Sequence, residues 1–389
     1  MKNQDLLNGA RSPADLFIGT VCAQGMKDLN LPYVLSYSPV SILNPFQKLL
    51  YCSATEAGYA IVPTAKFHDL GIVNWKNRSV IHLHWLASVL KNCKSSEHAE
   101  FCVREFEKLL VEWRSRGHKL LWTMHNLLPH DHSFTDAEIS LREVTIRHSN
   151  AIHVLSKDSV ELANDIYYVP EHKTFHVPHP SYEGWYPNIV DLATARQYLD
   201  LNFKEFVFLA FGSIQRYKGI VELIEAFKIL ERENRDRSLR LIISGKPADA
   251  NYMNEIIESI GAGSNINLIP NALEDRDIQV LFNAADVVVA PYSKTLNSGI
   301  SLLAATFMKE LVAPYSPGIT QTYAADTTLL YTGKPGDQLV DSLRRSINYK
   351  ISSVKFSEIL KLHNPNVVSK KFFDAITTYV LKTDGENSV

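Results

Sequence analysis

The sequence lacks an excess of either charge. Its 40 Lys and Arg residues are balanced by 42 Asp and Glu residues, so the 389-residue chain has a formal net charge of -2. Proteins that attract nucleic acids through their overall charge are usually strongly basic. The balance argues against such a general polyanion binder, and no nucleic-acid recognition motif is present, but a local basic site stays compatible with it.

Long hydrophobic runs are also lacking. No stretch approaches the 18 or so consecutive apolar residues of a membrane-spanning helix. The first residues, MKNQDLLNGARSPADLF, contain no uninterrupted apolar segment of the kind that signal peptides have. We therefore expect a cytoplasmic protein, and contact with the inner face of a membrane is left open.

Cysteine is scarce and scattered. Cys22, Cys52, Cys93 and Cys102 form no C-x-x-C pair, which excludes a disulfide scaffold and a zinc ribbon as sequence-level interpretations. We expect buried or unreactive thiols in a reducing compartment. Hydrophobic residues make up 46% of the chain, which together with the low net charge indicates a folded globular protein rather than a disordered one.

Short apolar segments alternate with amphipathic helical segments in the first half, which indicates a helix-covered, mostly parallel sheet. Strands are expected at 33–40, 79–85, 119–124, 151–155 and 174–177, with a long helix at 99–117. The segment PHPSYEGWYP (178–187) then has the composition of a loop, and we expect the domain junction there.

The same alternation restarts after this loop. Strands are expected at 206–212, 239–245, 266–269, 287–291 and 311–314, and helices at 219–231, 277–285, 298–309 and 369–382. The sequence therefore predicts an α/β protein with two doubly wound, Rossmann-like domains facing a central cleft, at 1–185 and 186–365. Residues 366–389 are predicted as a C-terminal helix, for which packing back on the first domain is one option.

Polar residues follow the first strand of the second half. In FGSIQRYKGIVELIEAF, Gly212 ends the strand and Lys218 precedes a helix, with Arg216 nearby. Ligands of parallel α/β sheets bind at the carboxyl ends of strands, and a helix start with cations suits a diphosphate. An ordinary turn with solvated cations is the alternative, because neither a Walker A loop nor G-x-G-x-x-G is present.

A second polar loop follows the strand at 287–291. It contains Thr295, Asn297, Ser298 and Gly299 immediately before a helix. Hydroxyl and amide groups beside free backbone N–H groups can bind an anion. Simple capping of the helix by Asn297 or Ser298 is the alternative interpretation. Two anion-compatible helix starts in one domain favour a phosphate-binding function.

These segments, in their order along the chain, resemble the nucleotide-sugar domain of GT-B glycosyltransferases. The series FGSIQRYKGIVELIEAF, LRLIISGKP, IPNALEDRDIQVLFNAADVVVAPY and TLNSG is most similar to the bacterial family-4-like group, and within it to the xanthan-type mannosyltransferases. The similarity extends to the first half through NPFQKLLY, HLHW and TMHNLLPHD, so it covers most of the chain.

The resemblance implies roles in binding the donor. Lys218 matches the lysine that contacts the donor phosphates, and Gly245 matches the glycine that ends the strand near the nucleotide base. The arginine of the family falls on Ser213, so Arg216 is expected to supply its charge. The loop from Thr295 to Gly299 matches the one that holds the diphosphate and the sugar.

One departure from the family concerns stereochemistry. Many retaining members carry a pair of glutamates here, and those positions fall on Leu296 and Ala304. An inverting reaction is therefore favoured, and it needs a base in the first domain to remove the proton of the acceptor hydroxyl. Asp131 is our first candidate and His125 the second, with orientation of the donor sugar as an alternative role for His125. The alternative is that Asp131 only caps the next turn and that the neighbouring histidines are solvated.

Other polar residues are weaker candidates for contact with the acceptor. These are Asn44, His84, Asn126 and His179. His82 and His84 share one strand face, but no third metal ligand is evident beside them, and the spacing of His125, His130 and His132 only superficially resembles a metal cluster. GT-B enzymes generally hold the diphosphate without a metal, so we expect neither a metal nor a cofactor.

The sequence thus predicts a hexosyltransferase. It would move a hexose from a nucleoside diphosphate sugar, with GDP-mannose favoured over UDP-sugars, to a carbohydrate or lipid-linked saccharide during synthesis of a surface polysaccharide. Two alternatives stay open. One is a catalytically silent subunit that binds nucleotide sugars, and the other is a different GT-B enzyme such as a nucleotide-sugar epimerase or a phosphorylase.

Overall fold

The structure, a computed structural model, describes residues 33–42, 44–71, 79–129, 133–292, 296, 299–324, 326–333 and 335–381. It divides into two compact units, of which unit 1 comprises residues 1–180 and 365–389 and unit 2 comprises residues 181–364. The boundary that the sequence suggested at 185/186 thus lies at 180/181, and the C-terminal segment belongs to unit 1. Each unit contains one six-stranded parallel sheet.

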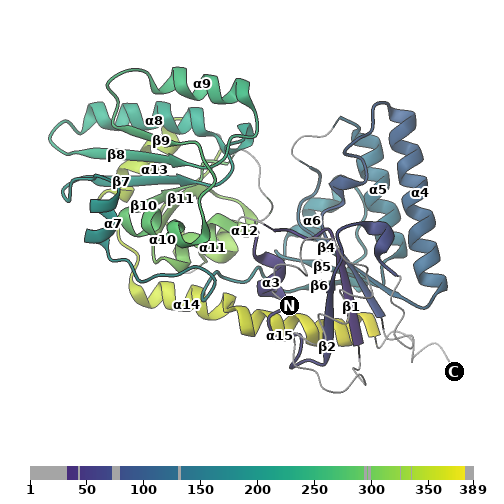
Figure 1. The fold of residues 1–389 in the computed structure, drawn as a ribbon. Coiled ribbons are helices and arrows are strands. Elements are labelled where there is room, and N and C mark those ends of the chain that lie inside the picture. Colours follow the sequence, from purple (N-terminus) through teal and green to yellow (C-terminus); the bar gives the residue numbers. More distant parts are fainter. Residues whose placement is uncertain are drawn as a thin grey trace. The chain divides into compact units, whose positions relative to one another are not determined.

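Unit 1 alternates strands with helices, as Figure 1 shows for each unit. Its elements are β1 (Tyr33–Ser38), α3 (Phe46–Leu50), β2 (Tyr59–Pro63), η1 (Phe67–Asp69), β3 (Ser79–Leu83), η2 (Leu86–Ser88), α4 (Ser96–Ser115), β4 (Lys119–Met124), α5 (Thr135–His148), β5 (Ala151–Val154), α6 (Ser159–Asn164), η3 (Glu171–Lys173), β6 (Thr174–His176), α15 (Pro365–Ala375) and the π-helical turn η5 (Ile376–Leu381).

Both faces of the unit 1 sheet are buried beneath helices. Successive side chains of a strand point to opposite faces, so each strand contributes to both cores. Leu120 and Trp122 of β4 pack in the core beneath α4 and α5. Leu121, between them, packs on the opposite face with α3 and α15. The strand order is β2-β1-β3-β4-β5-β6, so the topology reverses between β1 and β3.

Unit 2 repeats the plan with its own strands and helices. Its elements are α7 (Leu192–Tyr198), β7 (Phe206–Phe211), η4 (Arg216–Lys218), α8 (Ile220–Glu233), β8 (Leu239–Ser244), α9 (Ala250–Ile260), β9 (Ile266–Ile269), α10 (Asp275–Ala284), β10 (Val287–Val289), α11 (Gly299–Thr306), β11 (Glu310–Pro314), α12 (Pro317–Thr322), β12 (Leu330–Tyr331), α13 (Asp337–Ser346) and α14 (Ser353–His363).

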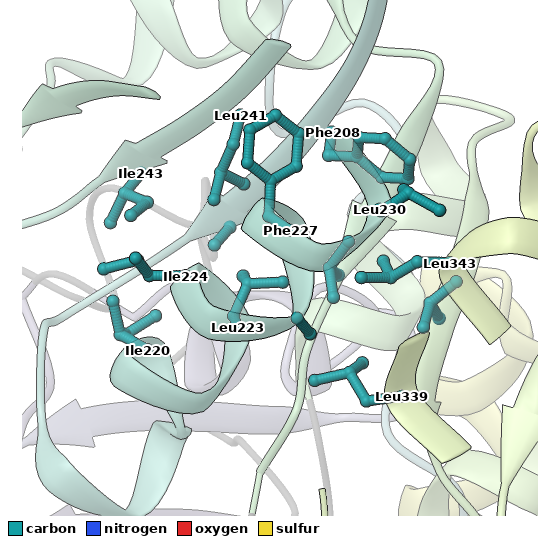
Figure 2. Packing of buried hydrophobic residues seen from close by; sticks show 14 of the residues in the cluster. Phe208, Ile220, Leu223, Ile224, Phe227, Leu230, Leu241, Ile243, Leu339 and Leu343 are labelled. Carbon is teal, nitrogen blue, oxygen red and sulfur yellow. The ribbon is translucent and has the colours of Figure 1, made fainter. Parts of the chain in front are cut away.

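The core of unit 2 forms where α8 and α13 cover one face of the sheet. Figure 2 shows Phe227 and Leu223 of α8 among Phe208 of β7, Leu241 of β8 and Leu343 of α13. All five side chains are fully buried. The strand order β12-β11-β10-β7-β8-β9 reverses between β10 and β7, which pair directly.

No helix among the described ranges is both long enough and apolar enough to cross a lipid bilayer. The longest of them, α4, carries charged side chains along its exposed face and buries Ala99, Phe106 and Leu110 against the sheet. That pattern is typical of an amphipathic surface helix.

Candidate functional site

The candidate donor site lies at the topological switch point of unit 2. The chain leaves β7 at Gly212 and leaves the neighbouring β10 before Pro291 and Tyr292. In open α/β sheets this crevice, outside the carboxyl ends of the strands, is where ligands bind. A small pocket opens here; it is lined by Ala210, Phe211, Gly212, Ile214, Lys218, Ile220, Ile243, Ser244, Val289, Pro291 and Tyr292.

Two glycines make the close packing of this pocket possible. Gly219 adopts a left-handed conformation with φ of 65° where η4 turns into α8, and a Cβ atom there would lie 2.4 Å from the carbonyl oxygen of Pro291. Gly245 follows β8, and a Cβ atom on it would lie 1.9 Å from the carbonyl oxygen of Gly212. Only glycine fits either position without moving the backbone of the pocket.

Lys218 is the central cation of the pocket. Its side chain is only 9% exposed, and its ammonium lies 5.3 Å from the ring centre of Tyr292. A Cβ atom on Gly212 would lie 2.8 Å from the Lys218 Nζ atom, so the ammonium sits directly against the end of β7. Among the described residues, no ion pair involves Lys218. Desolvation by burial lowers the pKa of Lys218 to about 8.

A buried hydroxyl group lies in the same pocket. Ser244 ends β8, and its Oγ atom is buried without a hydrogen-bond partner in the part of the chain that the structure describes. A buried polar group without a partner costs free energy, as does a buried ammonium without an anion. Both costs would be relieved by an anionic, hydrogen-bonding ligand such as a diphosphate.

Arg216 and Ser213 are placed differently from what the resemblance implied. The guanidinium of Arg216 forms ion pairs with Glu255 at 2.5 Å and Asp249 at 3.7 Å, and it lies 4.8 Å from the ring centre of Tyr252. Its charge is therefore already balanced within unit 2. Ser213 accepts a hydrogen bond from Gln215 at 3.3 Å. Lys218, in contrast to Arg216, has a charge that no ion pair among the described residues balances.

The second polar loop is described only in part. Gly299 begins α11, while Thr295, Asn297 and Ser298 lie outside the described residues. Leu296 and Ala304 stand where retaining relatives carry glutamates, and both are buried. No carboxylate is available at either position to contact a sugar hydroxyl.

A chain of hydrogen bonds crosses the carboxyl ends of three adjacent strands in unit 1. We call it the histidine chain, and its members are the carbonyl group of Val177 and the side chains of His153, Thr123, His82, Tyr51, His84 and His125. The strands involved are β3, β4 and β5, which pair directly in the sheet.

The proton positions in the first half of this chain follow from the carbonyl oxygen at its end. That oxygen, of Val177, can only accept, so His153 donates from Nε2 over 2.8 Å. Burial lowers the pKa of His153 to about 3, so the ring is neutral and Nδ1 accepts from the hydroxyl of Thr123 at 2.9 Å. Because Thr123 donates its one hydroxyl proton to His153, its oxygen atom accepts from His82 Nε2 at 2.6 Å.

The second half of the chain continues the same logic. Neutral His82 accepts at Nδ1 from the hydroxyl of Tyr51, at 2.7 Å. Tyr51 in turn accepts from Nε2 of His84, also at 2.7 Å. Neutral His84 then accepts at Nδ1 from Nε2 of His125 at 3.0 Å. The chain thus gives His125 a proton on Nε2 and leaves its Nδ1 atom as a hydrogen-bond acceptor.

Burial keeps these rings neutral. Desolvation lowers the pKa of His82, His84 and His125 well below the ordinary value of histidine, and the neighbouring imidazoles lower it further. All four ring nitrogens of His82 and His84 take part in hydrogen bonds, so this pair is not arranged as a metal site. Burial also raises the pKa of the Tyr51 hydroxyl, which therefore stays protonated.

His125 lies at the partly exposed end of the histidine chain. Its ring stacks on Trp85 with 4.2 Å between centroids and meets the edge of Phe46 at 5.0 Å. The following loop is held by Leu127, whose carbonyl oxygen accepts from Arg142 and from the hydroxyl of Tyr167 at 2.9 Å. The ring is therefore positioned from both sides, as an imidazole with a chemical role requires.

The remaining candidates have mixed surroundings. Asn44 accepts a hydrogen bond from the N–H group of Phe46 at 3.0 Å, which stabilises the turn before α3. His179 donates from Nδ1 to Pro180 at 2.6 Å and packs on Phe46. Asn126 is partly exposed beside His125. The preferred base, Asp131, lies outside the described residues together with its neighbours His130 and His132.

Several members of these sites were not singled out from the sequence. Ser244 and Tyr292 line the donor pocket, and Thr123 and His153 connect the histidine chain. Their one sequence signal is position, because each lies at or next to the carboxyl end of a predicted strand. A search for polar residues near the ends of apolar strands, such as Thr123 in KLLWTM, would have identified these residues.

A comparison with known protein families finds a match for part of the chain. The model of the family "Glycosyl transferases group 1" matches residues 193–358, which contain Gly212, Lys218 and Gly245. Two curated relatives, both named GDP-mannose:glycolipid 4-beta-D-mannosyltransferase and both from Xanthomonas campestris pv. campestris, are similar to the chain. One is 24% identical over 300 residues, covering 76% of this chain and 78% of the relative, and the other is 25% identical over 279 residues, covering 72% of each.

Solved structures share the fold at low sequence identity. Sucrose-phosphate synthase from Thermosynechococcus elongatus superposes with a TM-score of 0.67 at 13% identity, covering 89% of this chain and 98% of its own. The Anabaena protein HepE, crystallised with UDP-glucose, has a TM-score of 0.64 at 13% identity, covering 89% and 99%. Residues 193–358 thus match the glycosyl transferases group 1 family, and the chain shares the two-sheet GT-B fold of these solved structures.

Proposed function

We propose that the protein transfers a hexose from a nucleoside diphosphate sugar to a carbohydrate or lipid-linked saccharide. The observation that carries this proposal is the buried ammonium of Lys218, which lies at the switch point of unit 2 without an ion pair among the described residues. A buried charge without a counterion is costly unless a ligand supplies one. A diphosphate is such a ligand, and the matched family is one of glycosyltransferases.

In this proposal unit 2 binds the donor. The Lys218 ammonium contacts the diphosphate, Gly212 lets it approach the end of β7, and the Ser244 hydroxyl gains a partner. The same ammonium stabilises the negative charge that builds up on the leaving diphosphate. Gly245 and the loop from Thr295 to Gly299 complete the donor site, and no metal is needed. GDP-mannose is the favoured donor because the curated relatives are named for it.

Unit 1 then binds the acceptor and receives its proton. Nδ1 of His125 is an acceptor in the tautomer that the histidine chain imposes, so His125 is suited to take the proton of a sugar hydroxyl. Asp131 is the alternative base. A direct attack assisted by a base inverts the anomeric carbon, and inversion fits the apolar residues Leu296 and Ala304 where retaining relatives have glutamates.

The histidine chain would assist this step by holding the ring of His125 in its orientation and tautomer. As His125 takes the acceptor proton on Nδ1, its Nε2–H group keeps donating to Nδ1 of neutral His84, which stabilises the charge of the imidazolium. The far end of the chain is the carbonyl oxygen of Val177, which takes up no proton, so the proton stays on His125 until it leaves from Nδ1. Membership of a surface-polysaccharide pathway and contact with the cytoplasmic face of a membrane, where lipid-linked acceptors are found, belong to the same proposal.

Calorimetric binding of GDP, UDP, GDP-mannose and UDP-glucose tests the donor site. We expect one nucleotide to bind, and Lys218→Met to weaken it about 10- to 100-fold, since a hydrogen bond to a charged group contributes about 1.5–3 kcal/mol. Arg216→Met is the matched control. Because its charge is already paired with Glu255, we expect a change of less than about threefold. If wild-type protein binds none of the four, the proposal fails.

Turnover with lipid-linked saccharides tests the chemistry. We expect Asp131→Asn or His125→Asn to abolish transfer while leaving donor affinity unchanged, and NMR of the product to report an inverted anomeric centre. Donor binding without transfer to any acceptor would instead support the silent-subunit function. Conversion of the nucleotide sugar without an acceptor would support an epimerase.

A further inference from the structure

Three side chains outside both proposed sites converge where α4 begins. These are Cys93, His98 and Cys102, and one ligand atom of each lies within 4.8 Å of the other two. The two sulfur atoms are 3.6 Å apart. Neither the donor pocket nor the histidine chain includes any of the three.

The arrangement is built on a rigid part of unit 1. His98 and Cys102 are four residues apart on α4, so they share one face of the helix. The hydroxyl of Ser95 caps α4 by accepting from the N–H group of His98 at 3.2 Å. The N–H group of Cys93 donates to Leu90 at 3.0 Å, which closes the turn before the helix.

Packing fixes the two thiols as well. The side chains of Cys93 and Cys102 lie against the apolar core beneath α4, and the imidazole of His98 reaches them from the exposed side. The ligand atoms are therefore brought together by helix geometry, a cap and core packing, before any ion binds. This degree of preorganisation is what a specific metal site requires.

The chemistry and the spacing fit zinc. Zinc binds thiolate sulfur at about 2.3 Å in tetrahedral geometry, which places two bound sulfurs roughly 3.8 Å apart. The separation between Cys93 and Cys102 is close to that value. Two thiolates and an imidazole favour a borderline-soft ion over magnesium or calcium, which prefer oxygen ligands. We propose that Cys93, His98 and Cys102 bind a zinc ion, with water as the fourth ligand.

Such a site would tie the β3–α4 connection to the start of α4. This connection begins at His84 and Trp85, which contact His125. Zinc would thus stabilise the segment that follows His84 and Trp85, without taking part in the transfer reaction. The inference does not depend on the proposed function, because it concerns only the ligand set.

Cobalt titration of the reduced, metal-free, full-length protein tests this site. We expect one equivalent of Co²⁺ to bind with a thiolate-to-cobalt charge-transfer absorption, and Zn²⁺ to displace it. Cys93→Ser and Cys102→Ser should remove this absorption. His98→Ala should weaken binding at least about tenfold, since even loss of a group that only supports a ligand costs 10- to 100-fold. Cys52→Ser, at an exposed thiol outside the cluster, is the matched control and should change nothing.

Alkylation of the wild-type protein provides a second measurement that needs no variant to fold. Zinc should protect Cys93 and Cys102 from iodoacetamide and leave Cys52 reactive, as mapped by mass spectrometry. The proposal is overturned if reduced wild-type protein shows no charge-transfer absorption at equimolar cobalt, or if the Cys93→Ser and Cys102→Ser variants retain it. Equal alkylation of the three cysteines with and without zinc would also overturn it.

Discussion

The titration of a single residue, Lys218, should control how donor binding depends on pH. Burial lowers the pKa of Lys218 to about 8, and a bound diphosphate would raise it again by stabilising the ammonium. Above pH 8 the free protein has lost the proton that the complex needs, so binding must take a proton up. We expect affinity for the nucleoside diphosphate to be constant below about pH 8 and to fall up to tenfold per pH unit above it.

Isothermal titration between pH 6.5 and 9.5, in buffers of different ionisation enthalpy, measures both the affinity and the proton uptake. Lys218→Met removes the titrating group, so its weaker binding should be independent of pH over the same range. A wild-type affinity that stays constant up to pH 9.5, with no proton uptake, would contradict the assignment of Lys218 to the diphosphate.

Neighbouring residues show where prediction from sequence ends at this scale. Arg216 and Lys218 are two positions apart in the same loop, and the sequence offers both as phosphate ligands. Which of them is available depends on Glu255 and Asp249, which come from α9 and the loop before it. Lys218 was predicted as a phosphate ligand from its place before a helix and from the family resemblance, whereas the ion pairs of Arg216 are long-range contacts that no local pattern indicates.

At the scale of elements, the turn that joins η4 to α8 should be intolerant of a side chain at Gly219. Alanine there would have to hold φ of 65° and would place its Cβ atom 2.4 Å from the Pro291 carbonyl oxygen. The left-handed conformation alone costs about 1–2 kcal/mol. The clash would additionally shift the end of β10, which lines the donor pocket. We expect Gly219→Ala to lower the thermal midpoint and to weaken nucleotide binding at least tenfold.

Gly263 offers a matched control for this change. Its φ is 75°, but a Cβ atom there meets nothing within 4 Å. Gly263→Ala should therefore show the conformational cost without the loss of binding, as measured by differential scanning calorimetry and nucleotide titration. Equal effects of the two substitutions on binding would show that the contact between Gly219 and Pro291 does not shape the pocket.

The elements themselves were largely predictable where a hydrophobic pattern is strong. The strands expected at 119–124 and 266–269 agree with β4 and β9 residue for residue, and most others differ at one end. β2 was not predicted, because its segment YAIVP ends in proline and shows no alternation. Its position at the edge of the sheet explains why the proline is tolerated. Of the helices with ten or more residues, α5, α9, α13 and α14 were not predicted either.

At the scale of the whole molecule, each end of the described chain contributes to one core. Phe372 of α15 is fully buried in unit 1, where its ring stacks on His82 at 5.4 Å and lies 5.1 Å from His153. The C-terminal helix thus shields the histidine chain from water. From the sequence, packing of this helix on the first domain was only one option. The 3.6-residue periodicity of a helix shows which of its faces is apolar, but not which sheet that face covers.

This shielding has a consequence for stability in acid. Three buried histidines, His82, His84 and His153, and the partly exposed His125 all have a pKa below the ordinary value of about 6.5, mainly through desolvation. As the pH falls below 6.5, the unfolded chain binds protons that the folded chain does not. The free energy of unfolding must then decrease, by up to about 1.4 kcal/mol per pH unit for each ring.

Urea unfolding at pH 7.5, 6.5 and 5.5, followed by tryptophan fluorescence, measures this loss. Trp185 is the one tryptophan of unit 2, so a Trp185→Phe background restricts the signal to unit 1. In that background His153→Gln should lower stability at pH 7.5 but make it less dependent on pH, because one buried group no longer titrates. His172→Gln, at an exposed position of η3, should leave the dependence unchanged. If stability is the same at pH 5.5 and 7.5, the histidine chain is not held neutral by burial, and the tautomer assigned to His125 loses its basis.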